Sequence, residues 1–275
     1  MRGFRYTHVL CHVARYNVSA SAEKPYTSII HMTWTTSKVP DRWLRSSSTW
    51  PRMNQNFVYC LWNHSELEAF VADEYPWLLS TYLAYPYVIQ RCDAARYLLL
   101  YHYGGTYADL DLFCLSPLSV IFADAPIDAG MIVAPTIAFR VGMFFIVVRR
   151  PRDPVMRGVI SGLRRNAASY WYPPLSYFAV VYRVGTVYFT RRLNCYRGEG
   201  GIYVIPWSKL SSYIDHLHAS SWHKWDSWII WKIYLLLRWL YHHPVHLALS
   251  VTVFLLLISF IRNPRLSWSI PRFSG

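Results

Sequence analysis

The chain has 275 residues, of which 53% are hydrophobic and 17% aromatic, and its formal net charge is +13. This length is sufficient for one sizeable α/β domain with an appendage. The five cysteines include no Cys-x-x-Cys pair, which argues against a zinc module, and their number is odd, so no disulfide framework can be derived from them. The basic residues are scattered without a nucleic-acid-binding motif, so the charge favours an anionic membrane surface or a phosphate-bearing substrate instead.

The N-terminal residues 1–26 are expected to form a variable or disordered segment. They are basic, and their apolar run at residues 9–14 is too short and too polar for the core of a signal peptide. The folded domain is expected to cover residues 27–227. Its first elements are a short strand at residues 28–34 and a helix that begins near Pro40.

Residues 56–62 alternate in polarity and predict a second strand. A helix over residues 66–75 follows, and Asn63 or Ser65 can cap it. Strands that alternate with helices are typical of a doubly wound α/β sheet, in which ligands bind beyond the carboxyl ends of the strands.

The most informative stretch is residues 91–111, which predict a helix, a Gly104-Gly105 stop and a short strand. Along that strand Tyr107, Asp109 and Asp111 fall on one face, opposite an apolar face of Ala108, Leu110 and Leu112. Two carboxylates so close repel each other unless a cation lies between them. Mn²⁺ and Mg²⁺ prefer oxygen ligands, so Asp109 and Asp111 predict a site for one of these ions.

Asp93 and Arg96 lie three residues apart on the predicted helix and therefore share a face. One interpretation is a local ion pair worth a few tenths of a kcal/mol. The other is a pair that holds sugar hydroxyls, because the carboxylate accepts and the guanidinium donates hydrogen bonds.

The later part of the domain predicts buried strands at residues 131–134 and 143–148, a basic-faced helix over 154–166 and a short strand at 203–206. Beyond it, residues 228–275 form a third region. Residues 228–241 are apolar with Lys232 and Arg238, as in an interfacial helix.

Residues 245–261 carry no charge and, as a helix, would extend about 25 Å, which fits either a buried helix or a single membrane span. The tail contains Arg262, Arg265 and Arg272, so the positive-inside rule predicts that it is cytosolic and that the domain is luminal.

The string Arg-x-Asp-x-x-Arg-Tyr at residues 91–97, followed by Tyr-Gly-Gly-x-Tyr-x-Asp-x-Asp at 103–111, closely resembles the DXD-containing glycosyltransferases. It is most similar to the inositol phosphoceramide mannosyltransferases. Their Ile-Ile-His-x-x-Trp opening matches residues 29–34, and their Ser-Ser-Trp-His matches residues 220–223. The match covers roughly residues 28–125 and 218–224.

This resemblance implies a GT-A type, Rossmann-like nucleotide-sugar-binding domain with a C-terminal membrane helix. It implies catalytic roles for Asp93, Arg96, Asp109 and Asp111. It also implies a metal site made of Asp109, Asp111 and His223, and donor contacts from His31 or Trp34 near the base, together with Tyr107, Trp222 and His223.

The reaction implied by the resemblance is transfer of mannose from GDP-mannose to inositol phosphoceramide, with retention of configuration and with Mn²⁺ or Mg²⁺. The implied location is the Golgi or ER membrane, and any regulatory or partner subunit is left open. Arg140-Val141-Gly142 replaces an Asn-bearing segment of the family, which leaves the acceptor side open. The alternatives are transfer to a glycan or protein acceptor, and a non-catalytic, membrane-anchored carbohydrate-binding protein.

Overall fold

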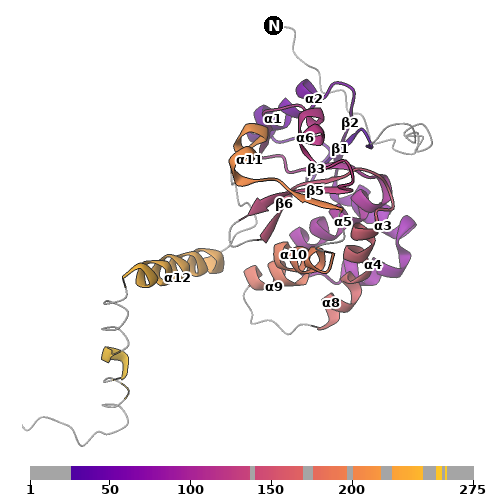
Figure 1. The fold of residues 1–275 in the computed structure, drawn as a ribbon. Coiled ribbons are helices and arrows are strands. Elements are labelled where there is room, and N and C mark those ends of the chain that lie inside the picture. The colour runs from indigo at the N-terminus through magenta and orange to yellow at the C-terminus, as the bar shows by residue number, and fades with distance from the viewer. Residues whose placement is uncertain are drawn as a thin grey trace, which may run out of the picture. The chain divides into compact units, whose positions relative to one another are not determined.

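The computed structural model describes residues 26–136, 140–169, 176–196, 201–217, 225–243, 252–255 and 258. The chain divides into two compact units, residues 1–222 and 223–275. The described part of the first unit is an α/β fold, with a central sheet between two groups of helices (Figure 1).

The central sheet has the strand order β2-β1-β3-β6-β5-β7. Strands β1, β2 and β3 run parallel, β6 is antiparallel to both β3 and β5, and β7 is parallel to β5. The bounds of the strands are β1 Ile29–Thr33, β2 Val58–Trp62, β3 Gly105–Ala108, β5 Met131–Thr136, β6 Arg140–Val148 and β7 Ile202–Val204.

Side chains alternate across these strands, so each face of the sheet packs against its own helices. Ile29 belongs to one apolar cluster and Ile30 to the other. The first cluster includes α3 (His64–Glu74), α4 (Pro76–Leu83), α5 (Val88–Tyr103), α7 (Pro154–Ser161) and α10 (Thr186–Asn194). The second includes α1 (Asp41–Ser47), α2 (Thr49–Met53), α6 (Leu118–Asp124) and α11 (Trp207–Tyr213).

A smaller sheet pairs β4 (Leu112–Cys114) with β8 (Ile214–His216) in antiparallel register, with Leu112 opposite His216. Two further helices, α8 (Leu163–Ser169) and α9 (Ser176–Arg183), complete the described elements of this unit. The small sheet matters for function, because it brings a segment from far along the chain beside residues 109–111.

The α/β prediction is confirmed, although the sheet is mixed because β6 runs against its neighbours. Two local predictions are wrong. The helix expected over residues 154–166 is two helices that separate at Gly162. The strand expected to carry both acids ends at Ala108, since the Leu112 amide donates to the Asp109 carbonyl (3.2 Å) and closes a turn.

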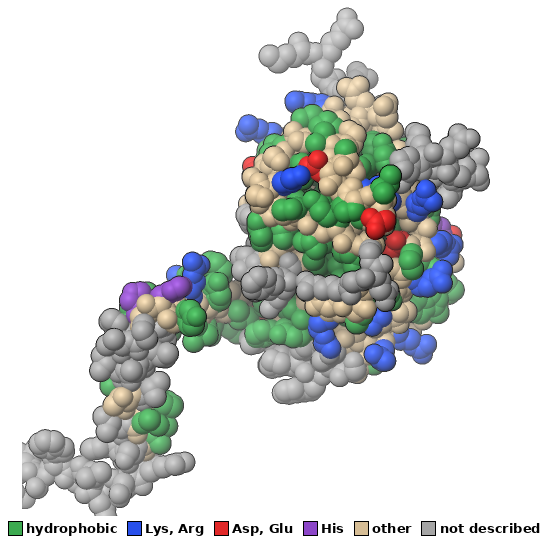
Figure 2. Space-filling view, viewed as in Figure 1, with side chains coloured by type: hydrophobic (Ala, Val, Ile, Leu, Met, Phe, Trp, Pro, Cys, Tyr) green, Lys and Arg blue, Asp and Glu red, His purple; other side chains and the backbone are tan. Residues whose placement is uncertain are grey.

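In the second unit, α12 (Trp225–His242) contains the helix predicted at residues 228–241. Many of its large apolar side chains are exposed, among them Trp228 (63%) and Leu237 (59%), and Figure 2 shows apolar side chains on the visible face of this helix. Among the described residues, no helix has both the length and the apolar character needed to cross a bilayer. The span expected at residues 245–261 lies outside the described residues, apart from 252–255 and 258.

Candidate active site

The site begins where α5 passes into β3 through two glycines with positive φ, Gly104 (67°) and Gly105 (92°). A Cβ on Gly105 would lie 2.6 Å from the Ile29 carbonyl oxygen, so only glycine fits this close approach. The tight turn sends β3 back beside β1. As a result, the C-terminal end of β3 and the side chains of α5 meet at one edge of the sheet.

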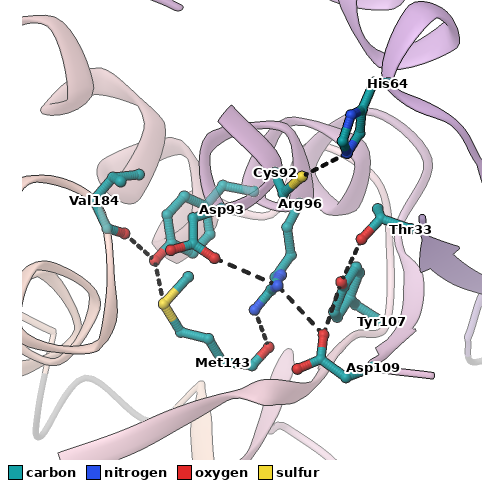
Figure 3. A network of polar contacts seen from close by, with 10 residues as sticks. Thr33, His64, Cys92, Asp93, Arg96, Tyr107, Asp109, Met143 and Val184 are labelled. Atoms are coloured by element: carbon teal, nitrogen blue, oxygen red, sulfur yellow. Dashed lines mark hydrogen bonds and ion pairs between the residues drawn. The ribbon is translucent and has the colours of Figure 1, made fainter. Parts of the chain in front are cut away.

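Arg96 lies at the centre of this edge and joins three elements (Figure 3). Its Nη2 is 3.4 Å from Asp93 Oδ1 and 3.3 Å from Asp109 Oδ1. Its Nη1 donates to the carbonyl of Met143 in β6 (2.5 Å). The Arg96 and Asp93 side chains are buried, whereas Asp109 keeps 32% of its side-chain surface exposed. One guanidinium therefore holds two carboxylates, and only one of them is open to solvent.

Tyr107 forms the floor beneath this guanidinium, since the Arg96 Cζ lies 4.1 Å from the centre of its ring. The Tyr107 hydroxyl donates to Asp109 Oδ1 (2.9 Å) and is 2.9 Å from the Thr33 hydroxyl. Thr33 ends β1, so two parallel strands contribute to the site at their carboxyl ends. That edge is where α/β sheets bind ligands.

Burial raises the pKa of both carboxyls that Arg96 contacts. It raises the pKa of Asp93 from 3.8 to about 7, while Arg96 lowers it and Asp109 raises it further. Burial also raises the pKa of Asp109, against the opposing effect of Arg96 and with an added rise from Asp111. Burial and the neighbouring carboxylates thus both disfavour the ionised forms, which favours a bound proton or cation at this edge.

Helices α1 and α2 fix the backbone of residues 110–112. The Ser46 hydroxyl donates to the Leu110 carbonyl (2.5 Å), and the Trp50 indole N–H donates to the Leu112 carbonyl (2.9 Å). Ser46 and Trp50 are both buried. The carbonyls of Leu110 and Leu112, which flank Asp111, thus each accept a hydrogen bond from a buried side chain. These two bonds fix the backbone of the turn that carries Asp109 and Asp111.

Asp111 faces a different neighbour, His216 on β8, whose Nε2 is 3.3 Å from Asp111 Oδ2. The Leu217 amide donates to the Asp111 carbonyl (3.1 Å), which continues the β4–β8 pairing. Sequence reasoning did not identify His216, Thr33 or the Met143 carbonyl. The feature of the sequence that came closest to indicating His216 was its position two residues before the segment 218–224, which resembles the mannosyltransferase family.

The structure brings Asp93, Arg96, Tyr107 and Asp109 together, with Asp111 two residues further along the turn. Trp34 follows β1 at the same edge, is partly exposed, and lies 5.6 Å from the Arg42 guanidinium carbon. His31 is completely buried; its Nε2 is 3.0 Å from the Gly104 carbonyl and its Nδ1 accepts from the Trp62 indole (3.1 Å).

With both ring nitrogens of His31 occupied, its position indicates a structural role rather than the predicted contact with a base. Burial lowers its pKa from 6.5 to about 4, so the ring is neutral at physiological pH. Trp222 and His223, predicted to contact the donor and the metal, lie outside the described residues.

The donor set at Asp109 and Asp111 fits a hard divalent cation, because carboxylate oxygens are available beside a partly buried imidazole. Within the described ranges no group of three or more His, Cys, Asp or Glu side chains is placed to hold a metal ion. A cation here would need further ligands from water or substrate. Mg²⁺-type sites commonly combine one or two carboxylates with substrate phosphates.

Residues 40–128 match the family model described as "Glycosyltransferase sugar-binding region containing DXD motif". This range contains α5, β3 and the acidic turn, and so includes Asp93, Arg96, Tyr107, Asp109 and Asp111. The predicted resemblance to DXD-containing glycosyltransferases is therefore confirmed.

Three yeast proteins show the same similarity. The chain is 36% identical over 160 residues to inositol phosphoceramide mannosyltransferase 2 of Schizosaccharomyces pombe, covering 57% of this chain and 44% of that protein. It is 28% identical over 255 residues to inositol phosphoceramide mannosyltransferase 3 of the same species (89% and 66%). It is also 28% identical over 212 residues to mannosyl phosphorylinositol ceramide synthase CSH1 of Saccharomyces cerevisiae (72% and 53%). The chain thus covers less than two thirds of each relative.

Proposed function

We propose that this protein, whose residues 40–128 form a glycosyltransferase sugar-binding region containing a DXD motif, transfers a mannosyl group from a nucleotide-sugar donor to a lipid acceptor. The observation that carries this proposal is the cluster in which Arg96 holds Asp93 and Asp109 above the ring of Tyr107. It lies at the carboxyl edge of parallel strands, where a GT-A type domain would bind its donor.

Each side chain has a distinct task in this proposal. Asp93 and Arg96, both buried, orient the sugar by holding the partly exposed carboxylate of Asp109, which can accept hydrogen bonds from sugar hydroxyls. Tyr107 keeps Asp109 in position through its hydroxyl. A bound Mn²⁺ or Mg²⁺ would neutralise the charge that develops on the departing diphosphate.

The choice of donor and acceptor is supported by the relatives. Two are named inositol phosphoceramide mannosyltransferases and one a mannosyl phosphorylinositol ceramide synthase, so we take GDP-mannose and inositol phosphoceramide as the substrates to test first. A basic chain suits an anionic lipid acceptor. The exposed apolar surface of α12, with its Trp and Tyr side chains, suits attachment at the membrane interface of the Golgi or ER.

The decisive experiment compares the wild-type protein with Asp111→Ala on a panel of nucleotide sugars with Mn²⁺ or Mg²⁺. We measure release of the nucleoside diphosphate and identify lipid products by mass spectrometry. The wild type should turn over GDP-mannose and mannosylate inositol phosphoceramide, and Asp111→Ala should lose at least about 100-fold in turnover, because charge stabilisation at the leaving group is removed.

Asp73→Ala is the matched control, since Asp73 is an exposed carboxylate on α3 in the same unit. It should retain full turnover. Equal activity of Asp111→Ala and wild type would remove Asp111 from the reaction. Transfer only to glycan or protein acceptors would replace the lipid-acceptor proposal, and wild-type protein that binds sugar without turnover would favour the non-catalytic alternative.

A further inference from the structure

The two acids of the motif differ in their surroundings. Asp109 is engaged through Oδ1 by both Arg96 and the Tyr107 hydroxyl. Asp111 instead has the imidazole of His216 at 3.3 Å, and the two side chains are 13% and 20% exposed. A guanidinium beside Asp109 repels a cation, whereas the imidazole beside Asp111 carries a ring nitrogen of the kind that ligates metal ions.

His216 is held firmly in this position. It lies opposite Leu112 in the β4–β8 register, and the next amide, of Leu217, donates to the Asp111 carbonyl. Its ring packs on Phe144 of β6, with 4.5 Å between the ring centres. Backbone pairing and ring packing together fix the imidazole against the Asp111 carboxylate.

The distance between the two side chains fits shared coordination of one ion. Octahedral sites for small divalent cations hold ligands at about 2.0–2.1 Å, which places neighbouring ligand atoms about 3 Å apart. The His216 Nε2 and Asp111 Oδ2 atoms are 3.3 Å apart, so a small adjustment would bring both within reach of one cation. A nitrogen ligand would also favour Mn²⁺ over Mg²⁺, which takes oxygen ligands.

We propose that His216 ligates the divalent cation together with Asp111, and that Asp109, held by Arg96, serves the sugar side of the site instead. This inference rests on the proposed function, in which a cation accompanies the donor. It reassigns the nitrogen ligand from His223, the histidine that the sequence predicted, to a residue that the β4–β8 pairing places next to Asp111.

The test is pulsed electron paramagnetic resonance of Mn²⁺ bound to the full chain, with and without GDP, because a coordinated imidazole gives a characteristic nitrogen modulation. The spectrum is recorded for wild type, His216→Gln, His223→Gln and the matched control His102→Gln. His102 is also paired with a carboxylate, Glu74, at 3.8 Å, but on the α3–α5 side of the sheet. Labelling histidine with ¹⁵N identifies the source of the modulation.

The modulation should be present in wild type, His223→Gln and His102→Gln and absent in His216→Gln. Mn²⁺ affinity of His216→Gln should fall by roughly 10-fold or more, as even the outer partners of metal ligands contribute about 10- to 100-fold. His216→Asp, which supplies an oxygen, should recover part of that affinity without the modulation and should bind Mg²⁺ better than wild type does.

Absence of histidine modulation in Mn²⁺-bound wild type, or its loss in His223→Gln alone, would overturn the assignment of His216. If His216→Gln does not fold, the spectra of wild type and His223→Gln still show whether His223 or another histidine supplies the nitrogen ligand. Donor turnover measured on the same samples keeps the two proposals separate. Turnover with Mn²⁺ but no His216 signal refutes only this inference, whereas Mn²⁺ held by His216 without any donor turnover refutes only the proposed reaction.

Discussion

At the residue scale, the surroundings of Asp93 and Arg96 distinguish a local ion pair on the helix surface from a pair that serves sugar binding. A solvated pair three residues apart on a helix would contribute only tenths of a kcal/mol. Here both side chains are buried, at 7% and 4% exposure, and Arg96 also contacts Asp109 and the Met143 carbonyl. Burying such charges is costly, so the pair is poorly explained as a device for stability. The contacts instead fit a positioning role in sugar binding, in which the buried pair holds the partly exposed Asp109 carboxylate at the site.

The raised pKa of Asp93 gives a prediction for folding. Because the folded-state value of about 7 exceeds the ordinary 3.8, the folded protein binds this proton more tightly than the unfolded chain does. The resulting stabilisation is complete below about pH 4 and is lost as the pH rises through about 7. We expect wild type to lose stability relative to Asp93→Asn across that window, as measured by urea unfolding at several pH values.

The contribution of His31 to stability has the opposite pH dependence. Its folded-state pKa of about 4 lies below the ordinary value of 6.5, so this contribution is lost as the pH falls from 6.5 to about 4. His31 is present in both proteins, so its contribution cancels in the difference. Parallel stability curves for wild type and Asp93→Asn between pH 4 and 8 would show that Asp93 is ionised throughout the folded state.

At the scale of elements, the turn between α5 and β3 sets the geometry of the site. α5 provides Asp93 and Arg96, β3 provides Tyr107, and only Gly104 separates the two elements. The close approach of Gly105 to the Ile29 carbonyl fixes β3 beside β1, and therefore sets the distance from Arg96 to Asp109.

We therefore expect Gly105→Ala to lower the free energy of unfolding by more than about 2 kcal/mol, because a side chain at positive φ would also collide with backbone. Gly201→Ala is the control. Gly201 has a φ of 108°, but an added Cβ would meet only a Val155 methyl at 3.8 Å, so its cost should stay near 1 kcal/mol. Equal losses in chemical denaturation would mean that the contact with Ile29 does not matter.

At the scale of the whole molecule, the first unit contains every described candidate site residue, and the second contains α12. A helix with exposed tryptophans and leucines on several sides is poorly suited to water. Its composition instead agrees with the predicted interfacial helix, in which Trp and Tyr lie at the level of the headgroups.

A chain that ends at Ser227 should thus bind lipid vesicles at least about tenfold more weakly than the full chain, since it lacks most of the apolar surface of α12. Cosedimentation with vesicles measures this, and hydrolysis of the donor checks that the first unit remains folded. Replacing Trp228, Trp231 and Trp239 by alanine in the full chain should weaken binding in the same direction. Unchanged sedimentation of the shortened chain would place the lipid contact elsewhere.

The sequence by itself determined the features that depend on neighbouring residues. The helix over residues 91–103, the glycine turn and the Asp-x-Asp spacing could be predicted because each lies within one local segment. The α/β class followed from the order of such segments. The end of β3 at Ala108 could not be predicted, since the turn after it depends on contacts from Ser46 and Trp50 on other elements.

Only the tertiary structure decided which groups meet across long separations. His216 reaches Asp111 because β8 pairs with β4, and the Met143 carbonyl reaches Arg96 because β6 lies beside β3. His31, which looked like a donor contact, is instead enclosed between Trp62 and Gly104. Residue spacing describes one strand or helix at a time, whereas strand order and packing, which bring distant residues together, arise only when the whole sheet assembles.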